Sequence, residues 1–127
     1  MKHLFSILVG LLSFSQFQAQ SCTADNGNGT FTNPLFYDEF TAPDLIRVGT
    51  DFNMVASSMH AMPGLPMLRS KDLVNWEFVT YIFDRLDLGP DFHLEGDKGI
   101  YGNGIWAPAI RYHKGTFYVF VNVNDHG

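Results

Sequence analysis

The stretch that most constrains the fold is residues 104–124, in which two runs of strand length flank a short polar turn. Ile105 to Tyr112 is rich in apolar and β-favouring residues, and Phe117 to Val121 is an unbroken apolar run. Between them, His113-Lys114-Gly115-Thr116 has the composition of a turn. This pattern predicts a β-hairpin.

A similar pattern occurs roughly sixty residues earlier in the chain. There Leu45 to Val48 and Phe52 to Val55 flank the turn Gly49-Thr50-Asp51, and Ile46-Arg47 corresponds to Ile110-Arg111. Similar hairpins at such a spacing predict a structural repeat, and the radial all-β repeat is the β-propeller.

The residues between the two hairpins supply further strands. Met59 to Pro66 contains two prolines and a glycine and is predicted to be a loop. Met67 to Ser70 is predicted to be a short strand, Lys71 to Asn75 a turn, and Trp76 to Ile82 another strand. Four successive strands make one propeller blade.

The segment from Asp84 to Gly104 is rich in glycine and predicts a connection between blades. The second hairpin then supplies about half of the next blade, so we expect a truncated propeller of about one and a half blades. Such a piece leaves apolar faces and sheet edges uncovered, and its stability alone should be poor.

Charge and composition narrow the choice of partner. The chain is 46% hydrophobic, which suits a globular protein, and its formal charge of −5 comes with no Lys/Arg cluster. We therefore expect no binding to nucleic acid or to an anionic membrane. Neutral substrates remain possible.

The amino terminus has the pattern of an export signal. Met1-Lys2-His3 precedes a short apolar run from Leu4 to Phe14, which is shorter than the roughly 20 residues of a membrane span. We predict a signal peptide over residues 1–20, a flexible leader over 21–33 and a propeller region over 34–127. The protein is then secreted or periplasmic.

Cysteine and histidine usage gives no sign of a metal or redox centre. Cys22 is the only cysteine, so no intrachain disulfide can form. The five histidines are scattered without metal-ligand spacing. We predict no metal and no cofactor.

Several segments together resemble the opening of glycoside hydrolase family 43, on the β-xylosidase and α-L-arabinofuranosidase side. They occur in the family's order from about Asn33 to the end of the chain: Asn33-Pro34-Leu35, Ala42-Pro43-Asp44-Leu45-Ile46-Arg47-Val48-Gly49, Ser57-Ser58-Met59-His60-Ala61-Met62-Pro63-Gly64-Leu65-Pro66, Ser70-Lys71-Asp72-Leu73-Val74-Asn75-Trp76 and Gly104-Ile105-Trp106-Ala107-Pro108.

This resemblance implies a five-bladed β-propeller that hydrolyses xylose or arabinose linkages with inversion. Three carboxylates act in such enzymes: a general base near the start of the first blade, an Asp that orients the acid, and a Glu general acid. Inversion needs the acid and the base about 6.5–9.5 Å apart. By this resemblance, residues 1–127 supply only the base.

The candidate base is Asp44. The usual family pattern places an Asp before the proline, and comparison through Ile46-Arg47 puts Ala42 at that position. Asp44 is the nearest acid, and residues two apart on a strand point the same way. Glu39 and Asp38 are the reserve candidates. Alternatively, Asp44 only caps a turn after Pro43, and the chain has lost its base.

Three further residues are candidates for substrate binding. The family places the Trp of Trp-Ala-Pro in the sugar pocket, here Trp106, and aromatic rings stack on the apolar faces of sugars. When the two hairpins are aligned at Ile46-Arg47 and Ile110-Arg111, Trp106 falls at the position of Ala42. Trp106 could equally belong to the core. Met59 and His60 occupy a loop where related sequences place a side chain in the pocket. Trp76 is expected in the blade core.

Two functions follow from these patterns. The first is hydrolysis of terminal xylosyl or arabinofuranosyl bonds in plant polysaccharides or oligosaccharides. The alternative is a propeller that binds carbohydrate without cleaving it, for which Ala42 is the main support.

Overall fold

The computed structural model describes residues 23–60, 64–93, 95, 97, 99 and 101–123. The predicted signal peptide, residues 1–20, and Cys22 lie outside these ranges. The described part contains six β-strands and one short 3-10 helix, η1 (Pro90–His93). None of its helices is long and apolar enough to cross a membrane.

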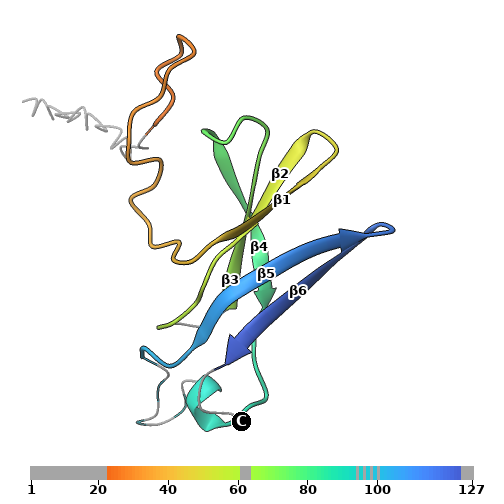
Figure 1. Cartoon of the computed structure of the whole chain (residues 1–127). Coiled ribbons are helices and arrows are strands. Elements are labelled where there is room, and N and C mark those ends of the chain that lie inside the picture. The colour runs from red at the N-terminus through yellow and green to blue at the C-terminus, as the bar shows by residue number, and fades with distance from the viewer. Residues whose placement is uncertain are drawn as a thin grey trace, which may run out of the picture.

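The first four strands form one antiparallel sheet in chain order. These strands are β1 (Asp44–Val48), β2 (Asp51–Val55), β3 (Gly64–Ser70) and β4 (Trp76–Phe83). The predicted four-stranded blade is therefore confirmed (Figure 1).

The third strand starts earlier than the sequence predicts. Residues 64–66 fall in the predicted loop, yet Gly64 pairs with Phe83 and Pro66 with Tyr81. Proline is tolerated because its carbonyl oxygen still accepts a hydrogen bond, here from the Ala56 N–H at 3.2 Å. The ladder is interrupted between Met67 and Leu68, where the register shifts.

The predicted second hairpin is present as β5 (Ile105–His113) and β6 (Thr116–Val123). Lys114 and Gly115 connect the strands with φ angles of 49° and 86°. Two successive positive φ angles are typical of the tight turn whose twist matches a hairpin.

The hairpin packs against one face of the first sheet (Figure 1). The buried contact joins Val55 of β2, Met67 of β3 and Ile110 of β5. Around this centre, the partly buried side chains of Ile46 and Val119 extend the core from both sheets. Burial of apolar area at this contact holds the two sheets together.

Residues 23–32, which lie within the predicted leader, close into a small turn. Asp25 and Phe31 form an isolated β-bridge, and the Thr32 N–H donates to the Ala24 carbonyl oxygen at 2.8 Å. The Asn75 amide group donates to Asp25 at 2.9 Å, which attaches this turn to the β3–β4 connection.

Candidate functional site

A cavity of about 550 Å³ lies on the face of the first sheet that the hairpin leaves open. The segment preceding β1 forms one side, the β2–β3 loop forms the rim, and β3 and β4 supply the floor. Its size falls within the range of small-molecule sites in proteins. The lining residues are Phe36, Asp38, Glu39, Phe40, Thr41, Ser57, Ser58, Met59, His60, Pro66, Leu68, Trp76, Phe78 and Tyr81.

Aromatic rings form much of one wall of this cavity. Phe36 contacts Phe40 edge-on at 4.9 Å and Trp76 at 6.0 Å between ring centroids. Trp76, which the sequence predicts in the blade core, is half-buried, and its indole N–H donates to the Leu73 carbonyl oxygen at 3.0 Å. Apolar rings beside a few polar groups suit a neutral sugar.

Two of the predicted binding residues and both reserve acids line this cavity. Met59 and His60 come from the β2–β3 loop, and Asp38 and Glu39 come from the segment before β1. Two carboxylates and an imidazole thus share one cavity. Asp44 and Trp106 are not among its lining residues.

The Asp44 carboxylate joins the first sheet to the hairpin. Its Oδ2 accepts from the Ile110 backbone N–H at 2.9 Å and from the Arg111 guanidinium at 2.8 Å. Its Oδ1 accepts from the Leu45 N–H at 3.0 Å. Three of about four lone-pair sites of the carboxylate are therefore occupied by this chain.

These hydrogen bonds favour the ionised form of Asp44. The Ile110 N–H, followed by Arg111 and the Leu45 N–H, lowers the pKa of the Asp44 carboxyl, while burial acts in the opposite direction. A lowered pKa keeps the group ionised at neutral pH and makes it a weaker proton acceptor.

Trp106 lies where β5 bends. The ladder to β6 is interrupted between Trp106 and Ala109. The Trp106 ring is half-buried, and its Nε1 is buried without a hydrogen-bond partner among the described residues. The structure thus places it at the start of the second blade but not on the cavity.

Backbone geometry changes the correspondence between the two repeats. Ala42 and Ala107 both precede a proline and both have left-handed φ angles, 44° and 41°. Ala107, and not Trp106, is therefore the structural counterpart of Ala42. Between Trp106 and Ala109 the pairing of β5 with β6 shifts by one residue. An alignment of the two hairpins at their Ile-Arg pairs does not detect this shift.

Ser57 and Gly104 were not among the predicted site residues, yet both help to join the two sheets. The Ser57 hydroxyl oxygen accepts the Ala107 N–H at 2.9 Å, and a Cβ on Gly104 would collide with the Ser58 carbonyl oxygen. Ser58 and Ile105 exchange two backbone hydrogen bonds of 3.0 and 2.9 Å. The Ser-Ser and Gly-Ile-Trp segments carry these contacts, but only the fold brings them together.

Within the described residues, no group of three or more His, Cys, Asp or Glu side chains is arranged to hold a metal ion.

Together, the four-stranded sheet and the hairpin packed on it define one blade of an all-β propeller and the start of the next, with an aromatic cavity on the first blade. The model of the glycosyl hydrolases family 43 matches residues 31–127, so the chain belongs to this family. It is 37% identical over 103 residues to a β-xylosidase of Formosa agariphila. It is also 37% identical over 116 residues to a non-reducing end α-L-arabinofuranosidase of Bacteroides ovatus.

Solved structures show the same similarity. A bifunctional family 43 enzyme of Bacteroides eggerthii superposes on 76% of this chain with a TM-score of 0.68 and 38% identity. A family 43 enzyme engineered to display both endo-xylanase and exo-arabinofuranosidase activity covers 74% of this chain with a TM-score of 0.66 and 38% identity.

The matches cover most of this chain but a small share of each relative. The alignments span 81% and 91% of the chain, against 17% of the Formosa enzyme and 20% of the Bacteroides ovatus enzyme. The matched part of this chain covers only 12% and 18% of the two solved structures. The described residues therefore form part of a five-bladed β-propeller, as predicted, with one blade and the first hairpin of the next.

Proposed function

We propose that the complete protein hydrolyses terminal xylosyl or arabinofuranosyl bonds in plant polysaccharides or oligosaccharides. The observation that carries this proposal is the family match over residues 31–127, together with relatives named for these two activities. The aromatic cavity with two carboxylates agrees with a neutral sugar as ligand.

The proposed reaction proceeds with inversion. One carboxylate takes a proton from a water molecule that attacks the anomeric carbon, and a Glu from outside residues 1–127 protonates the leaving oxygen. This chain contributes the proton acceptor and one wall of the site.

The candidates for the proton acceptor differ in their surroundings. Asp44, the residue predicted from the sequence, has three of its lone-pair sites occupied and stays a prediction. Asp38 and Glu39 line the cavity, which favours one of them if the sugar binds there. Each assignment predicts a different inactive variant.

The test is hydrolysis of nitrophenyl xyloside and nitrophenyl arabinofuranoside by the full-length protein and three variants. An acceptor role for Asp44 predicts that Asp44→Asn lowers kcat by about 10²–10⁴-fold in a protein that still folds. Asp38→Asn and Glu39→Gln then keep their turnover. Full activity in Asp44→Asn would remove Asp44 from the role, and a loss confined to Asp38→Asn or Glu39→Gln would assign the role to that residue.

A second candidate function is carbohydrate binding without hydrolysis. It is favoured by Ala42, which stands where the family resemblance places the acid, and by the bonding of Asp44. Ala42 is exposed and has a left-handed φ of 44°, a conformation that Asp adopts more readily than Ala. If binding is the function, wild type binds xylo-oligosaccharides without cleaving them, and Ala42→Asp creates hydrolysis.

We also propose that the protein is exported, on the basis of the apolar run after Met1-Lys2-His3. Amino-terminal sequencing of the protein recovered from cells tests this proposal. A mature chain beginning near Ser21 supports it, and an intact Met1 in cytosolic protein contradicts it.

A further inference from the structure

Beside the cavity, two aromatic rings from distant segments stack on each other. His60 ends the described part of the β2–β3 loop, and Tyr101 precedes β5. Their ring centroids are 4.4 Å apart with an angle of 26° between the planes. We call these two residues the His60–Tyr101 pair.

Hydrogen bonds tie the residues that follow Tyr101 to the β2–β3 loop. Gly102 directly follows Tyr101 in the chain, and its N–H donates to His60 Nδ1 at 2.9 Å. Next to it, the Gly104 N–H donates to the Met59 carbonyl oxygen at 3.1 Å. Because Nδ1 accepts, the proton of the neutral imidazole is on Nε2, which is therefore a hydrogen-bond donor.

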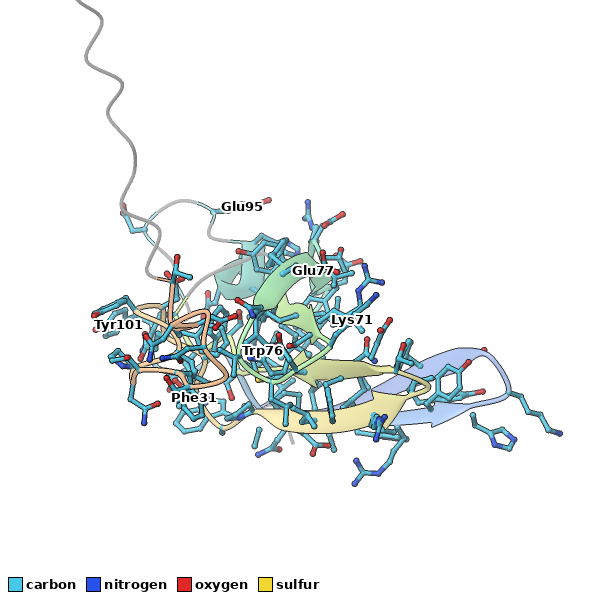
Figure 2. All side chains as sticks on the ribbon, turned by 90° about the horizontal axis from the view of Figure 1, so that it is seen from above. Phe31, Lys71, Trp76, Glu77, Glu95 and Tyr101 are labelled. Atoms are coloured by element: carbon cyan, nitrogen blue, oxygen red, sulfur yellow. The ribbon has the colours of Figure 1, made fainter. Side chains whose placement is uncertain are left out.

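Tyr101 stacks on His60 and yet remains open to solvent. Tyr101 is 82% exposed. By comparison, Tyr112, whose ring packs against Phe117 within the hairpin, is 39% exposed. In Figure 2 Tyr101 lies at the outside of the molecule, whereas Trp76 lies over the sheet. An ordered aromatic ring with one free face is ready to stack on a flat apolar ligand surface.

The position of the pair relates it to the cavity, because His60 lines the cavity and Tyr101 stacks on His60. A sugar chain that leaves the cavity over His60 would meet the open face of Tyr101. We propose that the His60–Tyr101 pair is an outer subsite for a neutral xylo-oligosaccharide, which stacks the sugar unit next to the one in the cavity. This inference rests on the proposed function in taking a pentose chain as the ligand.

The test compares short and long ligands on the full-length protein. Thio-linked xylobiose and xylotetraose, whose sulfur linkages resist hydrolysis, are titrated calorimetrically into wild type, Tyr101→Ala and Tyr101→Phe. Loss of one stacking contact should weaken xylotetraose binding by about 2–10-fold in Tyr101→Ala. Xylobiose binding should change less, and Tyr101→Phe should keep the wild-type affinity because it keeps the ring.

Phe31→Ala is the matched control. Phe31 is also an exposed aromatic residue, at 52%, and the 23–32 turn that carries it lies at the opposite end of the sheet from residues 101–104 (Figure 1). Its replacement should leave both affinities unchanged.

The outcomes separate this inference from the proposed function. Equal affinities of wild type for the two ligands, or an unchanged affinity of Tyr101→Ala for xylotetraose, would overturn the outer subsite even if the protein cleaves nitrophenyl pentosides. Tighter xylotetraose binding that depends on Tyr101, in a protein without hydrolytic activity, supports the subsite and contradicts hydrolysis.

Discussion

At the level of single residues, Asp44 shows how one carboxylate can connect two sheets. It sits at the first position of β1, and its Oδ2 binds the Ile110 N–H and the Arg111 guanidinium of β5. The Asp44 side chain is 34% exposed and that of Arg111 63%. The solvent-screened charge pair therefore contributes little by itself, and the hydrogen bond to the backbone of β5 matters more.

We predict that Asp44→Asn destabilises the full-length protein by about 1 kcal/mol, because a neutral amide has one acceptor oxygen in place of two charged ones. Denaturant unfolding measures this loss. The control is Asp84→Asn, at an exposed carboxylate that follows β4, and it should leave the free energy of unfolding unchanged. Equal unfolding midpoints for the Asp44 and Asp84 variants would contradict the connecting role.

The same carboxylate predicts a pH dependence. Its pKa is lowered in the folded protein from 3.8, so its contribution to the free energy of unfolding is complete above about pH 4–5. That contribution is lost as the pH falls through the lowered pKa. The stability difference between wild type and Asp44→Asn should thus be constant near neutral pH and vanish in acid. A difference that does not shrink as the pH falls below about 4 would show that packing, and not charge, causes it.

At the level of elements, the junction between the β2–β3 loop and β5 depends on the close approach of two backbones. Gly104 lies directly before β5, and its N–H donates to the Met59 carbonyl oxygen. A Cβ at this position would collide with the Ser58 carbonyl oxygen and lie 3.0 Å from the Met59 carbonyl group. Both obstacles are backbone atoms, so the strand start itself would have to move.

Gly104→Ala is therefore expected to destabilise the protein by about 1–3 kcal/mol, the usual cost of overpacking. Gly99→Ala is the matched control, because a Cβ on Gly99 meets nothing within 4 Å. Thermal unfolding of the two variants gives the comparison. If Gly104→Ala unfolds at the wild-type temperature, the close approach is not required.

At the level of the whole molecule, large apolar side chains on the outermost strands are left uncovered by the described residues. On β4, Val79 is 42% exposed, and on β6 Tyr118 is 47% and Phe120 64% exposed; none of the three lines the cavity. Apolar side chains gathered on the open face and edge of a sheet are contact surfaces or aggregation sites. In a five-bladed propeller, neighbouring blades cover such surfaces.

We expect residues 23–127 expressed alone to self-associate and to bind a hydrophobic dye, whereas the full-length protein remains monodisperse. Phe120→Lys on β6 should reduce this association, because a charge on an edge strand opposes pairing with another chain. Sedimentation velocity measures both effects. A monomeric, dye-free 23–127 segment would show that the six strands are sufficient without further blades.

The hairpins and the four-stranded blade could be predicted from local pattern, because strand periodicity and turn chemistry depend on neighbouring residues. The turn before Trp76 is an example: Asp72 accepts the N–H groups of Val74 and Asn75 at 2.9 and 2.7 Å, as Asp does in turns. Local pattern does not predict the start of β3, because glycine and two prolines suggest a loop. Pairing with β4 and the Ala56 N–H bond to the Pro66 carbonyl oxygen hold residues 64–66 in a strand.

Local sequence patterns are sufficient to identify the family, the strand order and two residues of the cavity rim, Met59 and His60, because motifs and periodicity depend on neighbouring residues. Tertiary structure alone decided which acids share a cavity, how the Asp44 carboxylate is bonded and that Tyr101 stacks on His60. The physical reason is that these contacts join residues far apart in the chain, and their geometry is fixed only when β5 docks on the first sheet.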